Sequence, residues 1–383
     1  MIRALIAQTN EIDEIDLAVV SILAQLELGH NLLKNSVGLL FCHFESLVPG
    51  LLEALCRSLP FNVTGSGTPM STSQTNLTGF SLLTLVVLTS DDVYFSLGLS
   101  EPLGHDLELT TRELTTRLTN GLNQAPKLGF IFAPPISKNF HASHLPKFFS
   151  AALNNCPLFG CLSCDFAPLT VNPKVIFNDQ CYENRFSLLL FYGLIKPKFN
   201  LINIPEKKAL KQRAIISKVN GNRLIEVNGI PILDYLNGMD VTDSLQSLLT
   251  MPLLVTKPDG ETKICMLTGF TSEGHGVCSQ DIPLNSTLGL AGFDETDVFR
   301  TAKELTEELK WEQFDFCLIL SCLGRNLSLG LNYMLEFDHF RSSLGNMLPY
   351  VVIYSGGEFC PEINSQGACS NSFSTLALTS CRF

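Results

Sequence analysis

One group of cysteines has a spacing that could support chemistry. The four thiols follow a C-x4-C-x2-C pattern with one more cysteine downstream, and they are Cys156, Cys161, Cys164 and Cys181. This spacing matches the ligands of a plant-type 2Fe–2S cluster. However, Pro157 and the apolar residues after it indicate the beginning of a buried strand, whereas a cluster needs an exposed loop around it. We therefore expect small buried thiols, no metal or cofactor, and no redox role for Cys161 and Cys164.

An arginine and a glutamate each follow an apolar run in a chain with few charges. Arg325 could bind a carboxylate with both arms of its guanidinium group, and Glu358 could accept an ammonium group. Together they would suit an amino acid zwitterion. The alternative is that the two side chains pair with each other inside the protein. Asp165 also has two interpretations, because an aspartate at the end of a loop can bind a ligand or cap a turn.

Two loops of small residues also follow apolar runs. They cover residues 65–68, which include Ser66, and residues 355–357, which end at Gly357. Glycine permits a positive φ and close approach of the backbone, so exposed N–H groups could hold an anion. The alternative is that both are simply tight turns. Neither loop completes G-x-G-x-x-G or a Walker sequence, which disfavours nucleotide binding.

The sequence shows no convincing catalytic signature. It contains no G-x-S-x-G nucleophile elbow and no H-E-x-x-H zinc motif. The seven histidines are dispersed, and we interpret His141 and His144, three residues apart, as structural. A Ser–His–Asp site assembled only in three dimensions stays an open alternative. We predict no catalytic residue.

These candidate residues lie on a repeated pattern of elements. Each of three segments has an amphipathic helix, an apolar strand, a second helix and a proline-led loop of small residues. The first helices are expected from residues 13, 106 and 294, and the strands from 37, 127 and 314. The second helices are expected near 48–58, 143–154 and 331–344, and the loops at 60–69, 157–165 and 349–358. Apolar runs of this length are typical of strands buried on both faces.

The third segment contains an insert that differs from the repeat. Residues 206–292 carry Asn-Gly turn signals between β-branched runs, at Asn220-Gly221 and Asn228-Gly229. We predict a mainly β insert there. The expected fold is α/β (α+β), with repeated helix–strand–helix–strand units and mixed sheets, because each unit ends in adjacent strands. We expect an N-terminal domain at 1–205 with two units, and a C-terminal domain at 206–383 with the insert and the third unit.

Composition excludes several classes of function. The 383 residues carry a net charge of −11, and one basic group (Lys207, Lys208, Lys211 and Arg213) is interpreted as a solvated linker, so nucleic acid binding is not expected. The N-terminus lacks a secretory signal, and the longest apolar runs fall short of the roughly 18 residues that span a bilayer. We expect a cytoplasmic protein without membrane insertion. The 13 cysteines are spread along a long chain, which favours reduced thiols over a disulfide framework.

This arrangement resembles the FIST family, named for F-box and intracellular signal transduction, over nearly the whole chain. Residues 35–200 resemble the N-terminal FIST region, and roughly residues 213–378 the C-terminal one. The most specific stretch has Ser-Cys-x-x-Arg after an apolar strand, then Leu-Gly, then an aromatic turn ending in Gly-Glu. Cys322, Arg325, Tyr354, Gly357 and Glu358 occupy these places, and Asp165 ends the matching second-unit loop.

The sequence departs from the family pattern at two loops. The first-unit loop usually ends in Gly-Glu, but this chain has Met70-Ser71 there. Cys161 and Cys164 stand where small residues, often glycine, are usual. A ligand that needs the first-unit acid would therefore be bound differently.

The resemblance implies a stand-alone, non-enzymatic sensory protein that binds a small polar metabolite such as an amino acid. We expect no output domain within this chain, and we therefore expect the signal to pass to a separate protein partner. The implied ligand-binding residues are Arg325, Glu358, Tyr354, Gly357, Asp165 and Ser66. Two alternatives remain, an enzyme acting on a small polar substrate and a haem-binding gas sensor.

Overall fold

The structure is a computed structural model of the full chain. It describes residues 1–47, 50–75, 79–104, 106–137, 140–165, 173–202, 209–239, 241, 248, 250–292, 294–310, 313–361 and 373–380. Lys207 and Lys208 lie outside these residues, as do the side chains of His141 and Lys211. Within the described part of the chain, no helix is both long enough and apolar enough to cross a membrane.

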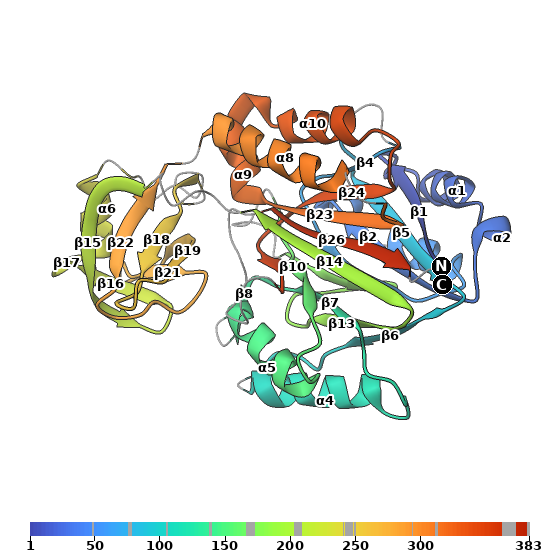
Figure 1. The fold of residues 1–383 in the computed structure, drawn as a ribbon, viewed down its shortest axis with the longest axis horizontal. Helices are drawn as coiled ribbons and strands as arrows, with labels where there is room; N and C mark the ends of the chain where they lie inside the picture. The colour runs from blue at the N-terminus through green and yellow to red at the C-terminus, as the bar shows by residue number, and fades with distance from the viewer. Residues whose placement is uncertain are drawn as a thin grey trace.

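The first unit builds a mixed sheet with helices on its outer face (Figure 1). Its strands stand in the order β1-β5-β2-β3, with β2 and β3 parallel and the other neighbours antiparallel. The elements are β1 (Ile2–Thr9), α1 (Ile15–Leu26), α2 (Leu28–Asn31), β2 (Asn35–Cys42), α3 (Leu51–Arg57), β3 (Val63–Gly67), β4 (Ser71–Ser73) and β5 (Leu83–Ser90).

The second unit repeats this order. Its strands stand as β6-β13-β7-β10, and β7 and β10 are the parallel pair. The elements are β6 (Val93–Leu99), α4 (Leu107–Thr119), β7 (Leu128–Ala133), β8 (Ile136–Ser137), β9 (Phe140–His141), α5 (Leu145–Ala152), β10 (Leu158–Leu162), β11 (Val175–Phe177), β12 (Gln180–Tyr182) and β13 (Ser187–Gly193).

The third unit has the same order again, β14-β26-β23-β24, with β23 and β24 parallel. The insert follows β14 and precedes α8. The elements outside the insert are β14 (Ile195–Ile202), α8 (Glu295–Lys310), β23 (Phe316–Cys322), α9 (Leu323–Leu329), α10 (Leu335–Leu344), β24 (Tyr350–Ser355), β25 (Glu358–Phe359) and β26 (Phe373–Ser380). Because β14 pairs with β26, this sheet uses strands from both sides of residue 205.

The three units exchange short strands in a closed cycle. The strand β4 of the first unit pairs with β24 of the third, β25 of the third pairs with β10 of the second, and β11 of the second pairs with β3 of the first. Each sheet is therefore completed by a strand from another unit, next to its own third strand. The units are linked to one another by backbone hydrogen bonds as well as by packing.

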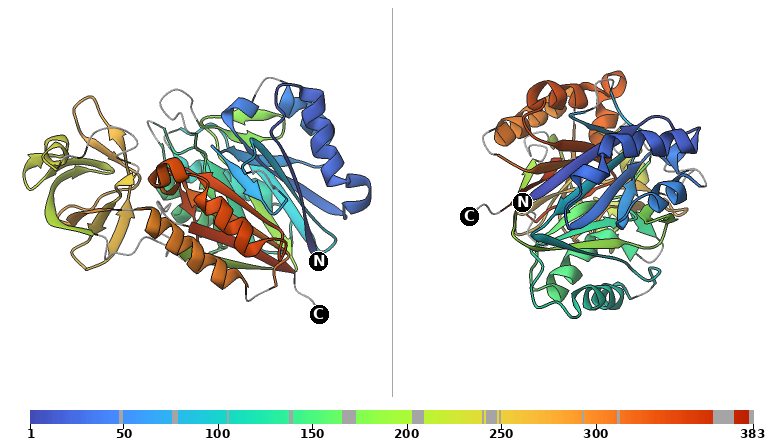
Figure 2. Two further views of the ribbon diagram at one scale, coloured as in Figure 1. Left: turned by 90° about the horizontal axis from the view of Figure 1, so that it is seen from above. Right: turned by 90° about the vertical axis from the view of Figure 1, so that its right-hand side faces the viewer.

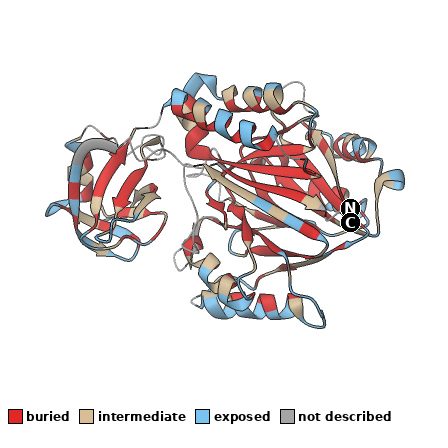
Figure 3. Cartoon of the chain, viewed as in Figure 1, coloured by how far each residue is buried: buried red, intermediate tan, exposed pale blue. Residues whose placement is uncertain are grey.

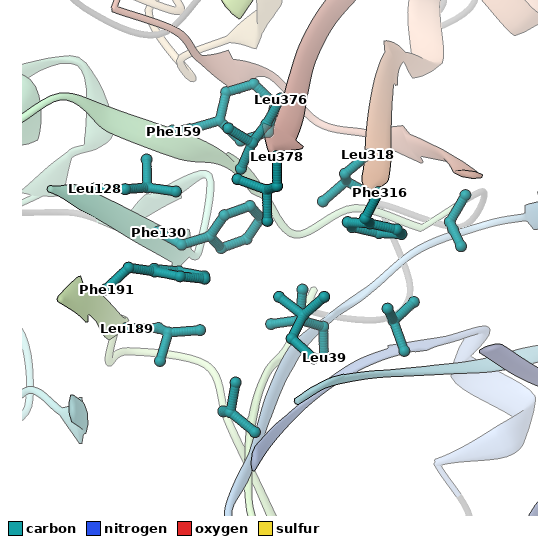
Figure 4. Close-up of a cluster of buried hydrophobic side chains, with 14 of the residues drawn as sticks. Leu39, Leu128, Phe130, Phe159, Leu189, Phe191, Phe316, Leu318, Leu376 and Leu378 are labelled. Carbon is teal, nitrogen blue, oxygen red and sulfur yellow. The ribbon is translucent and has the colours of Figure 1, made fainter. Parts of the chain in front are cut away.

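The inner faces of the three sheets share one apolar core. Side chains from all three units meet there, including Leu39 of β2, Phe130 of β7 and Phe316 of β23 (Figure 4). The helices lie on the outer faces, as the end-on view in Figure 2 shows. The central strands are accordingly buried on both sides, whereas the outermost strands β1, β6 and β14 are partly buried and the outer helix surfaces are exposed (Figure 3).

The insert forms a separate lobe beside the three repeat units (Figure 1). It has its own apolar core, formed by residues such as Ile216, Leu236 and Leu288. Contacts between the insert and the repeat units include that of Ile264 with Val298 and Leu329, and that of the His144 imidazole, which lies 3.1 Å from Asp281. Its elements are β15 (Ala209–Asn220), β16 (Arg223–Val227), β17 (Ile230–Pro231), α6 (Ile232–Asn237), β18 (Leu253–Thr256), β19 (Thr262–Cys265), β20 (Leu267–Phe270), β21 (Gly276–Cys278) and β22 (Thr287–Ala291).

The expected repeat, mixed sheets and β-rich insert are confirmed by this topology. The proline-led loops were expected to end equivalent strands, but most of their residues form equivalent strands themselves: β3, β10 and β24 begin within three residues of Pro60, Pro157 and Pro349. One helix differs from expectation. The helix expected at 331–344 begins at Leu335, and a further helix, α9, begins directly after β23.

Candidate functional site

The polar centre of the molecule lies where β3, β10 and β24 end. Three equivalent backbone N–H groups donate to the chain of another unit: Gly67 to the Lys174 carbonyl at 2.8 Å, Leu162 to Gly357 at 2.8 Å, and Tyr354 to Met70 at 3.2 Å. We call this place the central ring and assign to it Ser66, Thr68, Ser163, Cys164, Asp165, Ser355, Gly357 and Glu358. Every unit contributes to it.

Two further backbone hydrogen bonds join neighbouring units at two places in the ring, which we call corners. Cys164 N–H donates to the Gly67 carbonyl at 3.1 Å, and Gly356 N–H donates to Leu162 at 2.9 Å. The equivalent donor in the first unit would be residue 69, which is a proline and has no N–H. There the Thr68 hydroxyl donates instead to the Tyr354 carbonyl, at 2.6 Å.

Small residues are needed at the ring because the chains approach closely. A Cβ atom on Gly356 would lie 3.0 Å from the Ser163 carbonyl oxygen and 3.2 Å from Cβ of Cys164. On Gly65, inside β3, it would lie only 1.7 Å from the Leu40 carbonyl oxygen. Gly65 and Gly356 therefore have a packing role, and residues 65–67, expected in a loop, belong to strand β3.

Hydroxyl and carboxyl groups face one another inside the ring. The Ser66 and Ser163 hydroxyl oxygens are 3.0 Å apart, and the Ser355 hydroxyl donates to Glu358 Oε1 at 2.5 Å. Asp165 and Glu358 are both buried, with 3% and 0% of their surface exposed. The ring thus places two acidic side chains and several hydroxyls at the junction of three sheets.

Two thiols of the ring region are held in the protonated form. Burial raises the pKa of Cys161, and the Glu358 carboxylate raises it further, while the Ser66 hydroxyl lowers it. Burial also raises the pKa of Cys164, with further contributions from Cys161, Cys322, Asp165 and Glu358. Neither thiol is therefore a ready nucleophile at neutral pH.

The four cysteines with cluster-like spacing do not form one site. Cys161 belongs to the shared apolar core, Cys156 packs against the helical side of the second sheet, and Cys181 packs against that of the first. Cys161 and Cys164 are buried as expected, and the other two are partly buried. Among the residues that the structure describes, no group of three or more His, Cys, Asp or Glu side chains could hold a metal ion.

Arg325 lies in a buried network on the helical side of the third sheet. Its Nε and one terminal nitrogen donate to Glu336 Oε1 at 3.0 and 2.8 Å, and the same terminal nitrogen donates to the Thr301 hydroxyl at 2.7 Å. Glu336 Oε2 accepts from Ser321 at 2.9 Å and from the Tyr354 hydroxyl at 2.8 Å. Burial, and then Glu336, raises the pKa of Tyr354. These side chains tie α8, α9 and α10 to β23 and β24.

Tyr354 joins this arginine network to the central ring. Its hydroxyl reaches Glu336, while its carbonyl oxygen accepts from the Thr68 hydroxyl and lies 3.6 Å from the Cys164 sulfur. Of the six predicted ligand-binding residues, Ser66, Asp165, Gly357 and Glu358 lie in the ring and Arg325 lies in the network behind it. Their binding role stays a prediction, and the contacts of Arg325 and Tyr354 show a structural role.

Sequence reasoning missed Glu336, the carboxylate that partners Arg325. The feature that could have indicated Glu336 is its position in α10, one turn before Phe340, on the helix face that is buried against the sheet. A charge on such a face requires an ionic partner.

Comparison with models of known protein families shows to which family the chain belongs. Residues 36–230 match the FIST N domain model, and residues 232–361 match the FIST C domain model. The chain belongs to the FIST family. FIST domains are sensory domains of signal transduction. The two matches meet at β17 and α6, inside the insert, and not at a boundary between sheets.

Two further comparisons add little to this assignment. A crystal structure of cyanuric acid hydrolase from A. caulinodans aligns over 100% of both chains, with 7% identity and a TM-score of 0.41. That likeness is too weak to carry an argument about function. No curated protein sequence matches the chain.

Proposed function

We propose that this FIST protein is a non-catalytic sensor that binds a small polar metabolite, such as an amino acid, at the central ring and signals through a separate protein. The observation that carries the proposal is the meeting of three equivalent strand ends at one buried polar site. Ligands of α/β sheets bind at the carboxyl ends of strands, where backbone groups and side chains of several strands converge.

The chemistry of the ring favours a ligand that donates hydrogen bonds. Asp165 and Glu358 would accept from an ammonium or amide group, and the hydroxyls of Ser66, Ser163 and Ser355 can donate or accept. Arg325 and Tyr354 would hold the wall of the ring from behind, because Glu336 binds both of them. This changes the role expected for Arg325 from direct clamp to support.

The ring is also positioned so that a bound ligand would affect the contacts between the units. Each corner is bonded to the chain of another unit, so a ligand that moves one strand end alters contacts in all three sheets. The raised pKa values of Cys161 and Cys164 argue against thiolate catalysis at the ring.

A thermal-shift screen of amino acids and small amines tests the proposal. A ligand at 100 times its Kd should raise the free energy of unfolding by about 2.7 kcal/mol. We expect Glu358→Gln and the milder Ser66→Ala to remove most of the shift. Glu53→Gln, which changes an exposed carboxylate of α3, is the matched control and should retain it.

Two results would contradict the proposal. One is a ligand whose stabilisation is unchanged in Glu358→Gln, Asp165→Asn and Ser66→Ala alike. The other is chemical conversion of the stabilising compound by the wild-type protein, since a sensor should release it unaltered.

A further inference from the structure

The threefold repeat supplies an internal control for the surface of each unit. The helices α1, α4 and α8 are equivalent, because each connects the first and second strand of its unit. Each buries one face against its sheet, as Ala18 and Ile22 of α1, Leu114 of α4, and Ala302 and Leu305 of α8 show. Their outward faces do not pack against a sheet. We therefore interpret differences between these faces as reflecting what each face binds.

The outward face of α1 is apolar, whereas those of its two counterparts are mainly polar and charged. The exposed residues of α8 are Glu295, Thr296, Phe299, Lys303, Glu304, Glu307, Glu308 and Lys310. Those of α4 are Glu108, Leu109, Arg112, Glu113, Thr116 and Arg117, and those of α1 are Asp16, Leu17, Val20, Ala24 and Gln25. Leu17 and Val20 are 51% and 62% exposed. A helix that is apolar on both faces is expected to be covered on both.

The three apolar residues form a single stripe. Leu17, Val20 and Ala24 are spaced by three and four residues, so they lie along one side of the helix. This spacing is that of a ridge which packs into the groove of another helix. Ala24 is small and would let a partner backbone approach closely.

Acidic residues flank the stripe in the sequence. Glu11, Asp13, Glu14 and Asp16 are exposed before or at its beginning, and Glu27 is exposed just beyond its end. Residues 4–29 contain no lysine, arginine or histidine. The outward faces of α4 and α8, in contrast, carry charges of both signs.

We propose that the α1 face, defined as Leu17, Val20 and Ala24 with their acidic rim, binds an amphipathic helix of a separate protein whose apolar stripe is flanked by lysine and arginine. The stripe supplies apolar area for a helix of matching spacing. The rim supplies complementary charge, which governs partner choice and the rate of association. A second copy of this chain is disfavoured, because two such faces would bring acid against acid.

The α1 face is independent of the central ring. It lies on the outer side of the first unit (Figure 1), whereas the ring is buried between the sheets. Binding at the α1 face can therefore be measured without a ligand in the ring, and failure of either proposal leaves the other standing.

Fluorescence anisotropy with designed peptides tests the proposal on the full-length chain. The probe is a labelled helical peptide of about 18 residues, with a leucine stripe flanked by lysines, and its counterpart carries glutamates in place of the lysines. We expect the lysine peptide to bind at least about ten-fold more tightly than the glutamate peptide, and to weaken at about 0.5 M salt.

Two double variants locate the binding. Leu17→Gln/Val20→Gln removes the stripe without changing charge and should weaken binding of the lysine peptide about ten-fold. The matched control, Leu109→Gln/Leu122→Gln, removes two exposed apolar residues from α4 and the residues just after it and should bind like wild type. Both changes are on the surface, so the unfolding temperature should stay close to that of wild type.

Three outcomes would overturn the proposal. The first is equal binding of the lysine peptide to wild type and to Leu17→Gln/Val20→Gln. The second is equal affinity for the lysine and glutamate peptides. The third is a wild-type dimer in sedimentation that Leu17→Gln/Val20→Gln dissociates, which would show that a second copy covers the face.

Discussion

Replacing Glu336 by glutamine should weaken the fold far more than its conservative chemistry suggests. The carboxylate has no exposed surface and accepts hydrogen bonds from Arg325, Ser321 and Tyr354 at 2.8 to 3.0 Å. Glutamine keeps the shape, but it removes the negative charge and turns one acceptor into a donor that faces another donor. Loss of one partner of a buried ion pair costs about 3–5 kcal/mol. We expect Glu336→Gln to lower the free energy of unfolding by that amount.

Urea unfolding followed by circular dichroism measures this effect. The matched control is Glu304→Gln, which removes an exposed carboxylate from a pair with Arg300 on α8 and should cost less than about 1 kcal/mol. Arg325→Met in the Glu336→Gln background should restore part of the loss, because no buried charge is then left without its partner. The reasoning is refuted if Glu336→Gln costs no more than Glu304→Gln, or if the double variant is less stable than Glu336→Gln alone.

Three further predictions follow from packing and protonation. Gly65→Ala should destabilise the protein by about 1–3 kcal/mol or more, because its Cβ would lie 1.7 Å from the Leu40 carbonyl oxygen. Gly29→Ala, which has open space around its Cβ, should change stability by less than about 1 kcal/mol, and urea midpoints of the two variants test the difference. Stability should fall as pH rises from about 9 to 12, because the unfolded chain releases thiol and phenol protons that the folded chain retains. Burial raises the pKa of Cys56 to about 11 and those of Cys317 and Tyr350 to about 12, so a urea midpoint that is constant or rising with pH would contradict this assignment. Cys161 and Cys164 should resist a thiol reagent at pH 8 until urea is added, and rapid labelling of either in the native protein, located by peptide mass spectrometry, would contradict the burial and the raised pKa of that thiol.

Local sequence patterns predicted much of the fold. Helix periodicity and apolar runs recur three times, so β2, β7 and β23 were located from their own residues, whereas most residues of β3, β10 and β24 were expected in proline-led loops. The Asn220-Gly221 and Asn228-Gly229 turns likewise marked the insert. The division of the chain at residues 205 and 206 stays a prediction, although β14 pairs across it.

The exchange of strands could not be predicted from the sequence. The strands β4, β11 and β25 have only two or three residues each, too few to show a periodicity or to indicate a partner. Their pairing is decided by the close approach of three strand ends, which is a property of the assembled units. The central ring depends on this exchange of strands. The full set of residues that form the ring could therefore not be predicted from the sequence either.

The residues of the central ring were identified only in part from the sequence, and their binding role stays a prediction. Asp165, Ser66 and Glu358 stood out because they follow apolar runs, and the structure places them in one ring. Arg325 stood out for the same reason, but a sequence motif does not reveal which carboxylate lies beside a buried guanidinium. Glu336 is eleven residues further along the chain, on a helix whose outward charges concealed it.

Native mass spectrometry of gently purified protein tests the central claim most directly, because it shows whether a small polar metabolite occupies the ring. We expect wild type and Glu53→Gln to carry the same small-molecule mass, and Glu358→Gln and Ser66→Ala to lose it. Retention of that mass by both ring variants, with their fold intact by circular dichroism, would contradict the claim that the central ring is the sensory site.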